Sequence, residues 1–392
     1  MNILYLCDEY PPCKHGGIGS ITQILAREMV KKGHQVSVCG LYPYYRTAGL
    51  IEEDRGVKVY RVFYGNWLLL KLSKHNFFGR LINCEHNFIE YVKFLKVFIK
   101  KNNINIIEIP DFNEIFRYTG PRFISFPDFS IPSIIKLHSS YTLIDHIIGD
   151  HSSNKNILRK EFYLIQHANH LLAVSEFTKK VVSELFSVTK EIEVIHNGIT
   201  VSNQIRKSEN TFPTVVFAGT LAEIKGILSL IRAWSNVISV IPSANLFLYG
   251  KGGKNILKKI NKLISDKTKE SIHIKGFVSR SELMKIYRSA SCAIFPSYVE
   301  SFGMAPLESM QAGCPTIFTK RVSGGELIKN GITGLLVDPD NIQEISEALI
   351  NMLSDKKAAE EMGRRGAEIV KQKFNISTIA DLHIDLYKSI LI

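Results

Sequence analysis

The apolar positions of this 392-residue chain fall into short runs that alternate with longer stretches of helical periodicity. In the first half, the runs predict strands at Asn2–Cys7, Gln35–Cys39, Ile104–Ile109, Ser133–Leu137, His170–Val174 and Ile192–Ile195. In the second half, they predict strands at Thr214–Ala218, Asn245–Tyr249, Ile272–Ile274, Ala293–Phe295, Thr316–Phe318 and Leu335–Val337. Strands that alternate with helices are typical of parallel α/β domains.

A polar segment, Thr200–Thr211, separates the two series of strands and predicts an interdomain linker. The chain is also too long for one ordinary domain. We therefore predict two doubly wound, Rossmann-like α/β domains, residues 1–203 and 204–376, which face each other across one cleft. The ligand edge of each domain is expected at the carboxyl ends of its strands. An amphipathic stretch at 377–392 predicts a final helix.

Two helix starts can be placed from polar residues. Ser175 suits the N-cap of a helix over Glu176–Leu185. A second helix is expected at Asn341–Leu353, and it follows Asp338-Pro339-Asp340, which has the spacing of a DxD metal motif. Asp338 ends a predicted strand and Asp340 is placed to cap the helix, so we predict no metal site there.

The composition favours a cytoplasmic protein with full-sized cores. Apolar residues make up 45% of the chain, and no apolar run approaches the ~18 residues of a membrane span. The first strand, Asn2–Cys7, has no basic start and no long apolar stretch, so we expect no signal peptide. The six cysteines are scattered without metal-type spacing, which indicates reduced thiols.

The net charge of +12 is unevenly distributed. Residues 67–101 carry seven basic side chains against two acidic ones, together with many aromatic residues. Such a stretch fits either a peripheral contact with an anionic membrane or a buried helix with a solvated basic face. A second basic run, residues 254–269, is interpreted as a solvated helix face. No nucleic-acid-binding motif accompanies the charge, so we expect no nucleic acid partner.

Glycine-rich turns follow three of the predicted strands. Gly16 and Gly17 come after the first strand, and they let the backbone approach a ligand next to free N–H groups at a helix start near Ser20. Lys225 lies in the matching turn of the second domain, where a compact cation suits a diphosphate. Gly250 follows another strand and could line a base or phosphate site. Each of these turns could also be an ordinary βα turn or a helix cap.

Two carboxylates, Glu300 and Glu308, lie seven residues apart around a predicted junction of strand and helix. Pro306 suits the first turn of that helix, so Glu300 is expected in the loop and Glu308 in the opening turn. Free N–H groups there favour a phosphate, while one carboxylate accepts from a sugar and the other from a ribose. Glu308 could instead merely suit the helix dipole.

His138 directly follows the predicted strand Ser133–Leu137, at the edge where ligands are expected. A lone histidine is more often structural, but this position favours a functional role.

In combination, these motifs resemble the retaining nucleotide-sugar glycosyltransferases of family 4, which have the GT-B fold. The similarity spans most of the chain, and the order of its motifs across the two domains is specific. The matching segments are Pro11-Pro12 with Gly16–Gly19, Lys32–Val38, Lys136–His138, Val174–Thr178, Val194–Gly198, Lys225-Gly226, Glu300–Glu308, Gln311–Pro315 and Asn330–Val337.

The resemblance implies roles for the candidate residues. Gly16 and Gly17 would meet the donor diphosphate from the first domain, and Lys225 from the second. Glu308 would bind the ribose hydroxyls. Glu300 would bind the donor sugar, with His138 near the reacting carbon, so these two form the candidate catalytic pair. The remaining candidate donor contacts are Ser301, Phe302, Gly303 and Met304 for sugar and phosphate, Phe277 and Gly250 near the base, and Thr220. The final helix would cross back onto the first domain.

Thr220 is a departure from the family pattern, because many relatives carry Arg there. Arg can donate two parallel hydrogen bonds to a phosphate and Thr cannot. Either Lys225 therefore supplies more of the phosphate binding, or another cation compensates.

The implied function is transfer of a sugar, of the hexosyltransferase type and with retained configuration, from a nucleoside-diphosphate sugar to an acceptor hydroxyl. The expected acceptor is a lipid-linked glycan of bacterial surface polysaccharide synthesis, at the inner face of the cell membrane if residues 67–101 bind it. No cofactor and no metal are expected. The alternatives are a sugar-nucleotide epimerase or a phosphorylase of the same fold, a glycosidase with two carboxylates, and an inactive scaffold that only binds sugar nucleotides.

Overall fold

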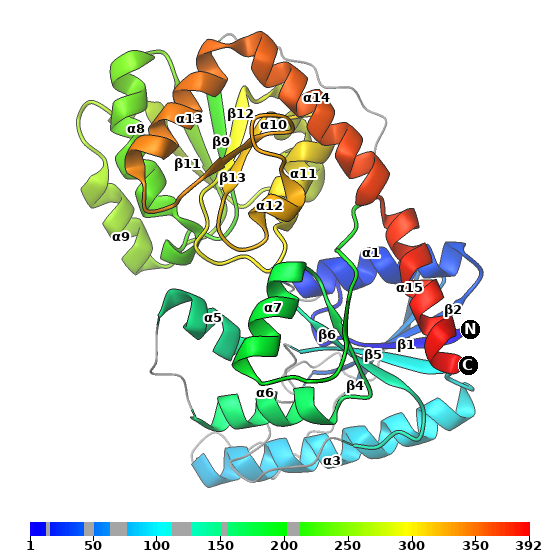
Figure 1. The fold of residues 1–392 in the computed structure, drawn as a ribbon. Helices are drawn as coiled ribbons and strands as arrows, with labels where there is room; N and C mark the ends of the chain where they lie inside the picture. The colour runs from blue at the N-terminus through cyan, green and yellow to red at the C-terminus, as the bar shows by residue number, and fades with distance from the viewer. Residues whose placement is uncertain are drawn as a thin grey trace. The chain divides into compact units, whose positions relative to one another are not determined.

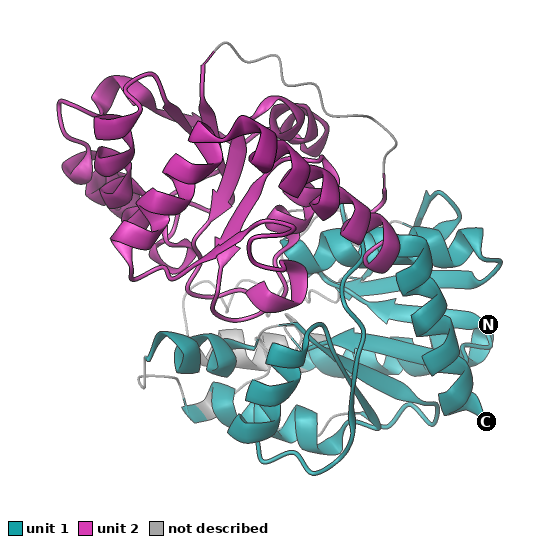
Figure 2. Ribbon diagram, turned by 45° about the horizontal axis from the view of Figure 1, so that its top comes forward, with its two compact units in different colours: residues 1–198, 376–392 teal, residues 199–375 magenta. Residues whose placement is uncertain are grey.

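The computed structural model describes residues 1–12, 16–42, 51–62, 77–111, 127–138, 140–149, 155–201 and 212–392 (Figure 1). The chain divides into two compact units (Figure 2). Unit 1 comprises Met1–Gly198 and Ile376–Ile392, and unit 2 comprises Ile199–Asn375. Each unit is a parallel-sheet α/β domain, so the predicted fold class of two doubly wound domains is confirmed. The boundaries predicted at 203 and 376 stay predictions, and most of the expected linker lies outside the described residues.

The sheet of unit 1 has the strand order β3-β4-β2-β1-β5-β6-β7-β8. Its strands are β1 (Asn2–Leu6), β2 (Gln35–Leu41), β3 (Ile51–Asp54), β4 (Val57–Val62), β5 (Ile106–Pro110), β6 (Ser133–Leu137), β7 (His170–Ala173) and β8 (Ile192–Val194). All neighbouring strands are parallel except β3, which runs antiparallel to β4 at the edge. Strands β3 and β4 were not predicted from the sequence.

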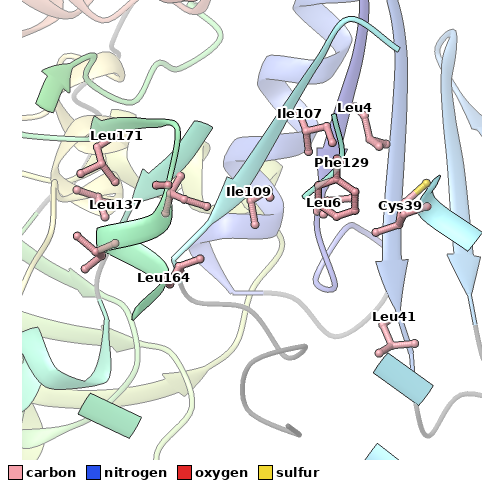
Figure 3. Packing of buried hydrophobic residues seen from close by; sticks show 14 of the residues in the cluster. Leu4, Leu6, Cys39, Leu41, Ile107, Ile109, Phe129, Leu137, Leu164 and Leu171 are labelled. Carbon is pink, nitrogen blue, oxygen red and sulfur yellow. The ribbon is translucent and has the colours of Figure 1, made fainter. Parts of the chain in front are cut away.

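Helices cover both faces of this sheet, which explains why its central strands are apolar throughout. The helices are α1 (Gly17–Lys31), α3 (Phe77–Lys101), α5 (Tyr141–Ile148), α6 (Lys155–His167), α7 (Glu176–Leu185) and α15 (Ile376–Leu391). In β1, Leu4 and Leu6 belong to one buried apolar cluster (Figure 3), which also includes residues of α3, α6 and α7. Ile3 and Tyr5 belong to a second cluster with residues of α1 and α15. The predicted N-cap Ser175 is confirmed, since its side chain accepts from the N–H of Thr178.

Helix α15 is fastened to the sheet of unit 1 by buried polar groups. The hydroxyl of Tyr387 donates to Glu108 over 2.6 Å, and the Lys136 ammonium lies 3.2 Å from the same carboxylate. Lys136 also lies 3.0 Å from Nε2 of His383. His383 Nδ1 is 2.8 Å from the carbonyl of Ile379, so Nδ1 is the donor and neutral Nε2 accepts from Lys136. The buried charged groups where α15 packs on the sheet of unit 1 are therefore paired.

Helix α3 contains the described part, residues 77–101, of the basic, aromatic stretch at 67–101. Phe88, Tyr91 and Phe98 are buried in the core, whereas Lys93 and Lys96 are exposed. The aromatic side chains thus belong to the core, and the lysines form a solvated basic face. Residues 67–76 lie outside the described residues, and membrane contact stays a prediction. Within the described part of the chain, no helix has the length and apolar character that a membrane crossing requires.

The sheet of unit 2 is wholly parallel, in the order β11-β10-β9-β12-β13-β14. Its strands are β9 (Thr214–Ala218), β10 (Asn245–Tyr249), β11 (Ile272–Gly276), β12 (Cys292–Phe295), β13 (Thr316–Thr319) and β14 (Leu335–Val337). Its helices are α8 (Ile227–Val240), α9 (Lys254–Leu263), α10 (Arg280–Ser289), α11 (Met304–Gln311), α12 (Gly324–Leu327), α13 (Ile342–Ser354) and α14 (Lys356–Lys373). Trp234 of α8 lies at the centre of the main apolar core.

Three helix starts differ from the sequence analysis. Helix α1 begins at Gly17 rather than near Ser20. Helix α11 begins at Met304, so Glu308 lies in its second turn and not in the opening turn. Asn341, not Asp340, caps α13 by accepting from Glu344 N–H, because Asp340 is held by Arg321 at 2.6 Å and by the hydroxyl of Tyr298.

Candidate functional site

The candidate residues of unit 2 follow the carboxyl ends of four adjacent strands. From β9 the chain adds β10 and β11 on one side and then crosses to β12 on the other, so the order reverses between β9 and β12. In open α/β sheets, ligands bind at such a switch point. Lys225 follows β9 and Glu300 follows β12, which places them on the two sides of this point. Gly250 and Phe277 follow β10 and β11.

Lys225 and Glu300 are joined directly. Lys225 ends the short 3₁₀-helix η1 (Glu223–Lys225), and its ammonium lies 2.7 Å from Glu300 Oε1 and 3.1 Å from the carbonyl of Val299. The two loops are also held together by the backbone, since Tyr298 N–H donates to the carbonyl of Ile224 over 2.8 Å. Both side chains are partly exposed, so a cation and a carboxylate are available together at the switch point.

Glu308 faces a different cation. Its Oε1 lies 2.8 Å from Nε of Arg280, the first residue of α10. Burial raises the pKa of the Glu308 carboxyl, and the nearby Arg280 guanidinium opposes that rise. The sequence analysis did not single out Arg280, because only the fold brings the start of α10 against α11.

The loop before α11 is anchored by Phe302 and Gly303. Phe302 is buried, packs edge-on against Phe374 at 5.6 Å, and accepts from the Ser323 hydroxyl through its carbonyl. Gly303 has a φ of 99°, and a Cβ there would lie 2.8 Å from the ring of Phe318. Gly303 is the N-cap of α11 and has no side chain with which to cap it, so the first turn can offer N–H groups such as that of Met304 to a ligand. Ser301 in the same loop is partly exposed.

The turns after β9 and β10 approach each other closely. Gly250 has a φ of 146°, and a Cβ there would meet the Gly219 carbonyl oxygen at 1.7 Å. Thr220, next to this contact, is exposed. Phe277 is 72% exposed, and its ring carries the Lys251 ammonium 5.4 Å from the centroid. An uncovered aromatic ring beside a cation is suited to stacking with a planar base.

The candidate residues of unit 1 also lie at the carboxyl edge of their sheet. His138 follows β6 and is buried, and its backbone N–H donates to Asp111 Oδ1 over 2.9 Å. Burial, with the adjacent Lys136 charge, lowers the pKa of His138 to about 3. The imidazole is therefore neutral at physiological pH and can act through hydrogen bonds.

Gly16 and Gly17 follow β1, at the start of α1. The N–H of Gly16 donates to the Glu9 carboxylate over 3.1 Å, so an anionic group already occupies this helix start. A Cβ on Gly17 would meet no atom of the described residues within 4 Å. A diphosphate that binds here must displace Glu9, a residue that the sequence analysis did not identify.

Charged pairs account for the DxD-like segment. Asp338 and Asp340 both contact the Arg321 guanidinium, at 2.7 and 2.6 Å. Among the residues that the structure describes, no three His, Cys, Asp or Glu side chains gather as a potential metal site.

Comparison with known proteins identifies the family. Residues 15–203 match the family model Glycosyltransferase Family 4, and residues 200–369 match Glycosyl transferases group 1. An uncharacterized glycosyltransferase of Methanocaldococcus jannaschii is 26% identical, over 99% of this chain and 98% of that protein. A glycogen synthase of Mycobacterium tuberculosis is 23% identical, over 99% of this chain and 94% of that protein. The crystal structure of Anabaena HepE with UDP and glucose superimposes with a TM-score of 0.75 at 18% identity, over 99% of this chain and all of that one.

The chain belongs to the glycosyltransferases of the GT-B fold, of the family 4 kind. The resemblance drawn from the sequence motifs is thereby confirmed.

Proposed function

We propose that the protein transfers a sugar from a nucleoside-diphosphate sugar to a hydroxyl of a glycan acceptor, with retained anomeric configuration. The observation that carries the proposal is the Lys225–Glu300 pair at the switch point of unit 2, beside the uncapped start of α11. A cation and free N–H groups suit a diphosphate, while carboxylates suit the hydroxyls of sugar and ribose.

Different groups of the site bind different parts of the donor. Lys225 and the N–H groups near Met304 hold the diphosphate, Glu300 accepts from the sugar hydroxyls, and Glu308 accepts from the ribose. The exposed ring of Phe277 stacks on the base. Negative charge grows on the departing diphosphate, so Lys225 holds it more tightly in the transition state than in the bound donor.

In unit 1, Gly16 and Gly17 stay candidate contacts for a diphosphate, and neutral His138 stays a candidate contact for a sugar. The acceptor oxygen attacks the anomeric carbon on the face that the diphosphate leaves. The bond from carbon to phosphate oxygen breaks as the new glycosidic bond forms, and the leaving phosphate takes the acceptor proton. In this scheme, retention needs no covalent enzyme intermediate, and no metal ion is required.

A glycan acceptor is supported by the name of the mycobacterial relative, a glycogen synthase. A lipid-linked glycan at the inner membrane face rests on the exposed lysines of α3, among them Lys93, Lys96 and Lys100. Such charges attract anionic lipid by about 1 kcal/mol each at low salt. Sedimentation with anionic liposomes tests this part. Binding that survives replacement of the three lysines by glutamate would contradict the assignment to α3.

Product analysis tests the proposed reaction against its rivals. We expect a glycoside whose anomeric proton coupling matches that of the donor, together with free nucleoside diphosphate. An epimerase would return an altered sugar nucleotide, and a phosphorylase would release sugar phosphate from a glycan. A glycosidase would ignore sugar nucleotides, and an inactive scaffold would bind the donor without turnover. Any of these four results would contradict the proposal.

A further inference from the structure

Arg280 connects two parts of the candidate donor site. It is the first residue of α10, three residues after Phe277, and its Nε lies 2.8 Å from Glu308 Oε1 on α11. A single short segment therefore carries both the exposed ring assigned to the base and the cation that touches the carboxylate assigned to the ribose.

The two partners of the contact between Arg280 and Glu308 differ in their exposure to solvent. The Arg280 side chain is 44% exposed, whereas that of Glu308 is 16% exposed. Arg280 engages Oε1 of Glu308 through its Nε. The guanidinium thus fixes the carboxylate, whose oxygens keep further lone pairs with which they can accept from ribose hydroxyls.

No second cation replaces Arg280 at this carboxylate among the described residues. From α10, the other titratable side chain that faces Glu308 is Tyr287, which is buried. Near the end of α11 lies the Cys314 thiol, also buried. On α14, which packs against α11, Glu361 pairs with Arg364 and Arg365. On the strands beside α11, Cys292 of β12 and the hydroxyl of Thr316 of β13 carry no charge.

We propose that Arg280 is a positioning residue that fixes the Glu308 carboxylate for the donor ribose and thereby makes the site prefer ribose over 2′-deoxyribose. The inference rests on the proposed function, which assigns Glu308 to the ribose.

The charge state of Glu308 makes the role of Arg280 measurable. Burial raises the pKa of Glu308, and Arg280 opposes this rise. Without Arg280 the pKa rises further, so a larger fraction of the carboxylate is protonated as the pH falls. A protonated carboxyl is the weaker acceptor. In a variant without Arg280, the preference for ribose should therefore be present at high pH and be lost as the pH falls.

The test compares Arg280→Met with Arg280→Lys, which keeps a cation. Lys285→Met, on the exposed side of the same helix, is the matched control for loss of one positive charge. UDP, GDP and ADP are titrated by calorimetry into each protein, and the one that wild type binds most tightly is compared with its 2′-deoxy form from pH 6 to 8. Thermal unfolding checks that every variant is folded.

Wild type and Lys285→Met should show the same ribose preference throughout this pH range. In Arg280→Met the preference should fall roughly 5- to 10-fold at the lowest pH and recover in part as the pH rises, because an ionised acceptor is worth roughly twice a neutral one. Arg280→Lys should retain most of it. An unchanged preference in Arg280→Met at every pH would overturn this inference alone. Failure of wild type to bind any of the three nucleotides would overturn the proposed function as well.

Discussion

Replacement of Lys225 by methionine removes the ammonium group but keeps most of the side-chain length. In the free protein the substitution breaks the 2.7 Å contact with Glu300 and leaves Ser297 Oγ, at 3.3 Å, as the remaining side-chain partner of that carboxylate. Both side chains are partly exposed, so the free energy of unfolding should fall by no more than ~1 kcal/mol. The effect on transfer should be larger, because the diphosphate gains charge in the transition state.

A charge-assisted contact of this kind is worth ~1.5–3 kcal/mol, which corresponds to a loss of roughly 10- to 150-fold in kcat/KM. The assay is the initial rate of nucleoside diphosphate release at subsaturating donor. Lys259→Met is the control, because Lys259 forms an exposed pair with Glu223 in the same unit and has no assigned donor contact. Transfer by Lys225→Met within threefold of wild type would refute the assignment of Lys225 to the diphosphate.

Three further outcomes are expected. Gly226→Ala should lower the stability by ~2 kcal/mol or more in thermal unfolding, since its φ is +70° and a Cβ would lie 1.8 Å from the Pro296 carbonyl oxygen, whereas Gly33→Ala at φ +86°, in open space, should cost about 1 kcal/mol. Burial lowers the pKa of His138 to about 3 in the folded protein, against ~6.5 in the unfolded chain. The buried neutral imidazole therefore costs no stability above pH 7, and it destabilises the fold as the pH falls below ~6.5. His138→Gln should flatten the fall of Tm between pH 7 and 5, and an unaltered slope would contradict this. Lys136→Met should destabilise by ~3–5 kcal/mol because it leaves buried Glu108 without its ammonium partner, and a Tm equal to that of wild type would refute this account of how α15 is held.

Much of the fold could be predicted because buried parallel strands are apolar on both faces. Ser133–Leu137 and Thr214–Ala218 were bounded correctly for this reason. Strand β3 (Ile51–Asp54), at the edge of the sheet, was missed because three of its four residues are acidic. Strand β4, next to it, was missed because buried positions alternate with more exposed ones. A pattern rule that seeks continuous apolar runs cannot find such strands.

The candidate site likewise has residues that the sequence could predict and contacts that it could not. Lys225 and Glu300 could be found because each lies in the connection after a predicted strand, at the sheet edge where ligands bind. Their mutual contact, and the contact of Arg280 with Glu308, join residues far apart in the sequence, so they depend on packing that no local pattern encodes. The Glu9 carboxylate at the start of α1 escaped notice for another reason, since a single acidic residue before a Pro-Pro turn has no distinctive spacing.

The measurement that tests the central claim most directly is a panel of UDP-, GDP- and ADP-sugars incubated with the purified protein and read by mass spectrometry for released nucleotide. The account predicts slow release of nucleoside diphosphate from one donor, reduced at least tenfold in Lys225→Met. A protein that neither releases nucleotide from any of these donors nor binds them in calorimetry would contradict the account.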